Sequence, residues 1–263
     1  MKPTRSTLRR PVAAATLSLV AVLWLASRMA GSATFAAPDE PAAQDGLITG
    51  TVAVPAAADN TLYESPQGTL SNGAGDHFFA GQTNNGDLRR GLVRFDLSPL
   101  PTWTSVISAS LVLQATTPLP VSTSVISVHP ASAGWGEGAS DAPGEEGAGT
   151  AAQPGDATWL HTSFPSANWT TPGGDFDPAA SAATIVAGNG AYSWSSPGLV
   201  ADVQDWVSNP ATNFGWLIAG DESSLHSAKR FDSRENDNPA NVPRLLVTFS
   251  VVLEQIALPV ILK

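Results

Sequence analysis

The residues best suited to bind a ligand by charge are arginines, and they are few. Beyond residue 28 the chain carries eight Lys and Arg residues, and most lie in two short runs, which contain Arg90 with Arg94 and Arg230 with Arg234. A guanidinium donates paired hydrogen bonds to carboxylate or sulfate oxygens. These four residues therefore predict a basic face for an acidic sugar. The alternative is a set of internal ion pairs with acids that are adjacent in sequence, namely Asp87, Asp96, Asp232 and Glu235.

The eight tryptophans are a second source of binding chemistry. An exposed indole presents a large apolar face on which a sugar ring can stack. Trp135 and Trp169 lie in segments without hydrophobic periodicity, so they are predicted as stacking platforms in surface loops. The alternative is that each anchors its own loop. Trp206 and Trp216 lie in apolar patterns and are predicted to belong to the core.

Calcium is the metal that the composition favours. The chain has no Cys, which excludes thiolate zinc sites, and its four His do not fall at metal-ligand spacing. Calcium prefers carboxylate, amide and backbone oxygens, which loops supply. Asp59, Asp232, Glu235 and Asp237 are predicted to hold a structural calcium ion. The alternative is that Asp and Asn at these positions only form turns.

The sequence offers little for catalysis or for nucleic-acid binding. It has no Gly-x-Ser-x-Gly elbow, and paired carboxylates form a glycosidase only across a cleft of fixed width. The formal charge is −10, but five of the 13 basic residues precede residue 29 and all 23 acids follow residue 38, so removal of the N-terminus leaves −15. Such a field repels phosphate backbones. We therefore expect neither an enzyme nor a nucleic-acid partner.

The two ends of the chain have their own predicted roles. Residues 1–36 combine a basic start, an apolar run too short to span a bilayer and small residues, which predicts a signal peptide and a secreted or cell-surface location. Residues 37–47 are predicted to be a spacer, and no transmembrane span is expected in the mature chain. Residues 251–263 form an apolar tail. Its residues 256–262 are predicted to be buried, either against residues 48–54 or on an envelope protein partner.

Residues 48–250 are predicted to form one all-β domain, an antiparallel β-sandwich (jelly roll) with one short helix and long surface loops. Alternation supports strands: Ile107, Ala109 and Leu111 share one face of a run. The helix is predicted over residues 199–208, after Ser196 as its N-cap. Residues 134–157 lack any period and are expected to be a functional or disordered loop. The predicted strands are 48–54, 60–64, 77–80, 92–97, 107–115, 121–129, 158–162, 183–187, 192–195, 214–219, 228–233 and 244–252.

An ordered set of motifs between residues 57 and 250 resembles the DNRLRE-domain family of exported bacterial proteins. The motifs are RRGLVRFDLS (89–98), ISASLVL (107–113), GWGEG (134–138), ATWLH (157–161), WTTPGGDF (169–176), DVQDWV (202–207), GWLI (215–218), KRFDSRE (229–235) and PRL (243–245). That family is similar to carbohydrate-binding module family 96, whose jelly-roll modules are often attached to polysaccharide-active enzymes or surface proteins. Two features depart from this pattern: a longer 134–157 loop, and the lack of an attached catalytic domain in this sequence.

The resemblance implies sugar binding or surface display rather than catalysis. The expected function is therefore an exported, non-catalytic carbohydrate-binding module for a polysaccharide or cell-surface glycan. The alternative is a structural or adhesive surface module without sugar specificity. A hydrolase is the third possibility, because a fold alone does not decide function.

Overall fold

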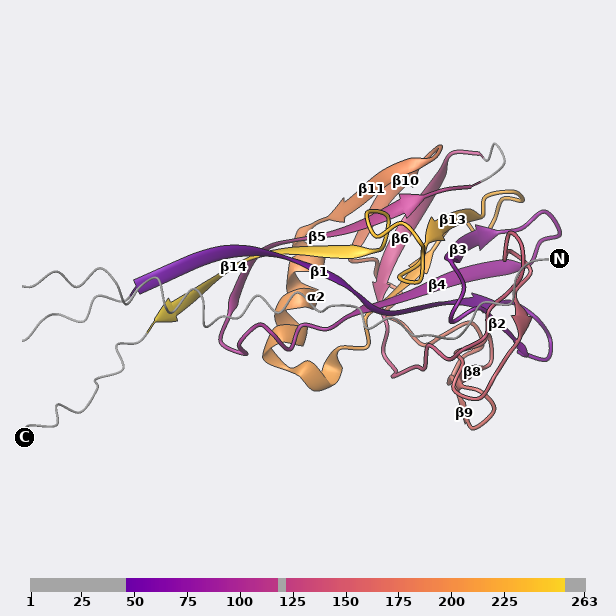
Figure 1. Ribbon diagram of the computed structural model, residues 1–263, viewed down its shortest axis with the longest axis horizontal. Helices are drawn as coiled ribbons and strands as arrows, with labels where there is room; N and C mark the ends of the chain where they lie inside the picture. Colours follow the sequence, from indigo (N-terminus) through magenta and orange to yellow (C-terminus); the bar gives the residue numbers. More distant parts are fainter. Residues whose placement is uncertain (1–45, 118–121, 254–263) are drawn as a thin grey trace, which may run out of the picture. The chain divides into compact units, whose positions relative to one another are not determined.

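The computed structural model describes residues 46–117 and 122–253. The predicted signal peptide, most of the spacer and the tail beyond residue 253 lie outside the described residues. Strands dominate, and the predicted all-β antiparallel sandwich is confirmed (Figure 1). The strands are β1 (Gly46–Tyr63), β2 (Leu70–Ser71), β3 (His77–Gln82), β4 (Leu88–Phe95), β5 (Ser105–Ala115), β6 (Ser124–Pro130), β7 (Thr150–Ala151), β8 (His161–Ser163), β9 (Ala167–Asn168), β10 (Ala182–Val186), β11 (Gly190–Ser195), β12 (Trp216–Ala219), β13 (Lys229–Asp232) and β14 (Arg244–Leu253).

The main strands form two layers that share strands β1 and β3. In the first layer β14 pairs with β1 and β5, while β5 also pairs with β11 and β13, and β13 pairs with β3. In the second layer β4 pairs with β1, β3 and β12, and β6 pairs with β12 and β10. β1 changes layer along its length: residues 46–55 pair with β14 and residues 56–63 pair with β4, with a register shift between Ala56 and Ala58. The predicted strands 48–54 and 60–64 are thus one continuous strand.

The main core lies between the two layers. Leu111, Trp194 and Phe231 of the first layer and Val93 and Trp216 of the second are all fully or almost fully buried in it. The α-helix α2 (Pro197–Ser208) closes this core from the side.

α2 forms where the sequence predicts it. The Ser196 hydroxyl accepts a hydrogen bond from the Leu199 amide, and Pro197 occupies the first turn, where its missing N–H costs nothing. The helix buries Leu199, Val203, Trp206 and Val207 and ends at Asn209. A 3-10 turn, η1 (Pro210–Thr212), follows. Trp206 lies against Trp216 with 4.5 Å between ring centroids, so both predicted core tryptophans are confirmed.

A second core covers the outer face of the second layer. Adjacent residues of β4 point to opposite faces, so Val93 enters the main core while Leu92 joins Leu62 and Leu217 in the second. The long connection between β6 and β10 supplies the covering side chains, including Trp135, Trp159 and Trp169. Residues 134–157, predicted to be a functional or disordered loop, are not disordered: Trp135 and Ala157 are buried in this second core, so the segment covers the second layer.

Two boundaries and the buried face of one strand also differ from the sequence prediction. Gly46 and Leu47, assigned to the spacer, and residues 251–253, assigned to the tail, belong to the β1–β14 pair. Ile107, predicted to face the core, is 53% exposed and Val106 is buried instead, because a register shift between Thr248 and Phe249 in the β14–β5 pair moves the face.

In the described part of the chain no helix is long and apolar enough to cross a membrane.

Candidate functional site

Arg90 and Arg230, two of the predicted ligand-binding arginines, are occupied inside the protein. Arg90 forms a bidentate pair with Glu222, with Nε–Oε1 and Nη2–Oε2 distances of 2.6 and 2.8 Å, and also donates to the Gly173 carbonyl. Arg230 pairs with Glu145 and donates to the Thr116 carbonyl. Internal ion pairs therefore exist. The acids that pair with Arg90 and Arg230 are distant in sequence, whereas Arg234 contacts its predicted neighbour Glu235.

Arg234, a predicted ligand-binding residue, lies in a cluster of three carboxylates. Two of these carboxylates, Asp59 and Glu235, are predicted calcium ligands. The Nε and Nη2 of Arg234 donate to the two oxygens of Glu137 at 2.6 and 2.9 Å, and Nε lies 2.9 Å from Glu235 Oε1. Its backbone N–H donates to Asp59 Oδ2 at 2.8 Å. The Asp59 N–H in turn donates to Glu137 Oε1 at 2.9 Å. We call Asp59, Glu137, Arg234 and Glu235 the carboxylate–arginine cluster.

Protonation rather than a second cation balances this cluster. Burial, with the nearby Glu137 charge adding to it, raises the pKa of Asp59 to about 8. Burial, followed by the charges of Asp59 and Glu137, raises the pKa of Glu235 to about 9. At neutral pH Asp59 and Glu235 therefore keep their protons, and the guanidinium of Arg234 is held by its paired contacts with Glu137.

Because of these raised pKa values, the free energy of unfolding depends on pH. The folded state binds protons that the unfolded chain releases above about pH 4, so the free energy of unfolding falls as pH rises from about 5 to about 9. We expect Glu235→Gln, which cannot ionise, to flatten this part of the profile by about 1.4 kcal/mol or more. Urea unfolding between pH 5 and 9 measures it, and parallel wild-type and variant profiles would contradict the assignment.

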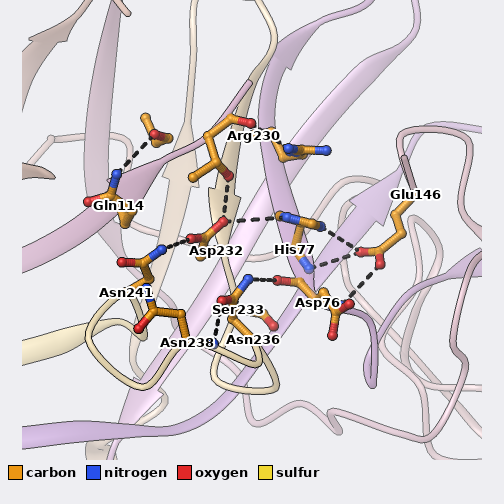
Figure 2. Close-up of polar contacts among 12 residues, drawn as sticks. Asp76, His77, Gln114, Glu146, Arg230, Asp232, Ser233, Asn236, Asn238 and Asn241 are labelled. Atoms are coloured by element: carbon orange, nitrogen blue, oxygen red, sulfur yellow. Dashed lines mark hydrogen bonds and ion pairs between the residues drawn. The ribbon is translucent and has the colours of Figure 1, made fainter. Parts of the chain in front are cut away.

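Asp232, another predicted calcium ligand, belongs to a separate network centred on His77 (Figure 2). His77 Nδ1 lies 3.3 Å from Glu146 Oε2, and its Nε2 lies 3.4 Å from Asp232 Oδ1. Asp232 also accepts from Asn241 Nδ2 at 2.7 Å. Burial opposes ionisation of Glu146, but hydrogen bonds from His77 and Asn72 outweigh it and lower the pKa of Glu146. This network ties β3, β13 and the 134–157 cover together.

The four predicted calcium ligands thus do not converge. Asp59 and Glu235 share the carboxylate–arginine cluster, Asp232 contacts His77, and Asp237 is exposed in the segment between β13 and β14. Among the described residues no group of three His, Asp or Glu side chains is arranged to hold a metal ion. In the cluster the guanidinium of Arg234 lies where a cation would have to bind. Calcium binding stays a prediction from the sequence.

Trp135 and Trp169 do not form the exposed platforms that the sequence analysis predicts. They are 5% and 6% exposed, and their indole N–H groups donate to the carbonyls of Phe214 and Thr158 at 2.8 and 2.9 Å. A sugar ring cannot stack on a covered indole face. The alternative, that these tryptophans anchor their loops, describes their place in the second core.

Arg94 differs from the other three predicted arginines. Its guanidinium lies over the Trp135 ring, 5.3 Å from the centroid, and within the described chain it forms no ion pair or side-chain hydrogen bond. Arg94 also lines a surface hollow of about 300 Å³. The hollow is bounded by Ala57, Arg94, Phe95, Asp96, Leu97, Ser98, Trp206, Pro210 and Asn213. Of these, Asn213 donates to the Phe95 carbonyl, but its buried Oδ1 has no partner among the described residues.

The connection that begins at this hollow also carries the most exposed tryptophan of the described chain. Trp103 is 72% exposed, in the turn between β4 and β5. α2 holds this turn: Gln204 donates to the Thr104 carbonyl at 3.0 Å and accepts from the Val106 N–H at 2.8 Å. The sequence signal for Trp103 is its position in a short Pro-Thr-Trp-Thr connection between two predicted strands.

A second hollow, of about 510 Å³, is a weaker candidate. Its arginine, Arg89, is buried and already donates to the carbonyls of Gly147 and Leu88 at 3.1 and 2.8 Å. Glu64, on the same wall, accepts from the Leu88 N–H at 2.7 Å. Arg89 and Glu64 therefore use their side chains to stabilise the fold. We take the hollow at Arg94 together with the Trp103 turn as the candidate site.

No protein-family model matches the chain, and no curated protein matches it. The resemblance to the DNRLRE-domain family therefore stays a prediction from sequence motifs.

Proposed function

We propose that this protein is an exported, non-catalytic carbohydrate-binding module whose ligand binds at the β4–β5 connection. The observation that carries the proposal is Trp103, a large indole that is 72% exposed while its turn is hydrogen-bonded to α2. Because α2 fixes the backbone beside Trp103, a ring that stacks on the indole costs conformational entropy in the side chain but little in the turn.

The hollow at Arg94 supports the same proposal and narrows the ligand. Its lining combines Arg94, which has no ion pair among the described residues, with the exposed Asp96, with Ser98 and with apolar side chains. Such a mixture suits a sugar, which has hydroxyl groups at its rim and C–H groups on its faces. An unpaired guanidinium additionally favours a sugar that carries a carboxylate or sulfate.

Replacement of Trp103 by alanine tests the proposal. A glycan array of neutral and acidic oligosaccharides, screened with and without calcium, first identifies a bound glycan. We then expect Trp103→Ala to weaken its affinity at least about tenfold, which corresponds to about 1.4 kcal/mol. Isothermal titration measures the affinity, and the unfolding midpoint should not change.

Leu225→Ala provides the control, because Leu225 is also an exposed apolar residue, at 55%, but lies in the connection between β12 and β13. It should leave the affinity unchanged. Arg94→Gln should weaken acidic glycans more than neutral ones. Equal affinity of the wild type and Trp103→Ala for every bound glycan would contradict the proposed site.

A further inference from the structure

The hollow at Arg94 has one guanidinium available for an acidic group of a ligand. Among the residues that line it in the described chain, Arg94 is the one basic residue. Three other arginines of the described chain form ion pairs, namely Arg90 with Glu222, Arg230 with Glu145 and Arg234 with Glu137. Arg89 and Lys229 are 6% and 1% exposed and donate to backbone carbonyls. Arg244 lies on β14 and does not line the hollow.

Asp96 places a carboxylate at the same hollow, two residues after Arg94. It is exposed, and its Oδ1 accepts a hydrogen bond from the Ser98 N–H at 2.9 Å. Neither Arg94 nor Asp96 forms an ion pair within the described chain, so both charges act on a ligand. A carboxylate accepts hydrogen bonds from sugar hydroxyls but repels a second anion. The hollow therefore suits one acidic group with hydroxyls beside it.

The charge of the whole chain opposes a second acidic group as well. Beyond residue 28 the sequence has 23 Asp and Glu against eight Lys and Arg, so the hollow lies in a negative field. At physiological ionic strength such a field acts over about 8 Å. A polymer with an acidic group on every ring would place the groups that flank Arg94 within this range, where no described cation is free to meet them.

We propose that the bound glycan is mostly neutral and carries isolated carboxylate or sulfate groups, and that polymers charged on every ring are excluded. This inference rests on the proposed function, because it concerns the glycan that binds at Arg94 and Trp103. The isolated acidic group accepts the paired donors of Arg94. An uncharged ring of the same chain stacks on Trp103.

An array graded by charge density tests the inference on the wild-type protein. The probes are neutral glycans, glycans with one uronic acid or one sulfate among neutral rings, and the dense polyanions polygalacturonate and heparin. We expect the glycans with one acidic group to bind most tightly. The two polyanions should bind at least about tenfold more weakly, which titration calorimetry resolves.

The salt dependence of the affinity should have opposite signs for the two kinds of acidic probe. Added sodium chloride screens the attraction between Arg94 and an isolated acidic group, so the affinity for that glycan should fall. Residual binding of polygalacturonate should instead strengthen, because salt screens the repulsion between the polymer and the acidic protein. Calorimetry at low and high sodium chloride measures both.

Asp96→Asn tests the residue that opposes dense charge. The asparagine keeps a side-chain oxygen for the Ser98 N–H and removes the negative charge. It should strengthen the binding of polygalacturonate about threefold or more, as expected when one like charge at close range is removed in water. The matched control Asp141→Asn changes the net charge equally, but Asp141 is exposed in the 134–157 segment and does not line the hollow. It should leave this binding nearly unchanged.

The results separate this inference from the proposed function. Polygalacturonate or heparin that binds as tightly as the glycans with one acidic group, with an affinity that falls as salt rises, would overturn the inference alone. Neutral glycans that bind more tightly than those with one acidic group would do the same, as would equal effects of Asp96→Asn and Asp141→Asn. If no glycan binds, or if Trp103→Ala leaves every affinity unchanged, the proposed function itself fails and this inference fails with it.

Discussion

Arg234→Met is expected to destabilise the protein by about 3 kcal/mol at neutral pH. The variant keeps the apolar stem of the side chain but removes the cation that contacts Glu137 and Glu235. These carboxylates are 18% and 23% exposed, so water replaces the guanidinium only in part. Glu137 must then either protonate or remain charged beside two other acids. Urea unfolding measures the loss.

The pH dependence of this loss separates the cluster from ordinary packing. Toward low pH carboxylates in general take up protons, so leaving one without its cation costs less, and the difference between Arg234→Met and the wild type should shrink. Glu137→Gln in the Arg234→Met background should recover part of the stability, because it removes the unpaired charge. The control is Arg244→Met, since Arg244 has no ion pair within the described chain; it should change stability by less than about 0.5 kcal/mol. A loss for Arg234→Met that is constant with pH would contradict the electrostatic account.

The sheets and the helix could be predicted from the sequence because their signals are local. Alternation of apolar residues identifies the strands, and Ser196, Pro197 and Asn209 mark the ends of α2. Ile107 marks where reasoning from alternation fails: Ser108 is opposite Thr248 and Val106 is opposite Phe249, so Ile107 is the unpaired extra residue of a bulge in β5. The alternating pattern of apolar residues does not reveal that bulge.

The candidate site was less predictable, since its properties arise from contacts between distant parts of the chain. Arg90, Arg94 and Arg234 are equivalent in sequence terms, yet Arg90 and Arg234 pair with acids 132 and 97 residues away and Arg94 does not. Trp103 and Trp135 both lie in segments without hydrophobic period. Their burial differs because the 134–157 segment covers the second layer, and no periodic pattern encodes that cover.

Trp135→Ala is expected to destabilise the protein by about 3–5 kcal/mol, the usual cost of truncating a buried aromatic side chain. Trp135 packs with Leu92 and Leu217 in the second core, and it donates its indole N–H to the Phe214 carbonyl at 2.8 Å. Its loss also removes the ring beneath the Arg94 guanidinium. Chemical denaturation measures the effect, and limited proteolysis should show earlier cleavage within residues 134–157.

Two variants separate the contributions to this effect. Trp135→Phe and Trp135→Ala both leave the Phe214 carbonyl without its indole donor, but phenylalanine keeps an apolar ring in the core. Trp135→Phe should therefore cost less than Trp135→Ala, and the difference reflects the larger cavity that alanine leaves. Trp103→Ala removes the same side chain from an exposed turn and should change stability by less than about 0.5 kcal/mol. If Trp135→Ala costs no more than Trp103→Ala, the second core does not unfold together with the sandwich. The segment at residues 134–157 would then be a separable cover, and its acidic residues would be free to act as a binding loop.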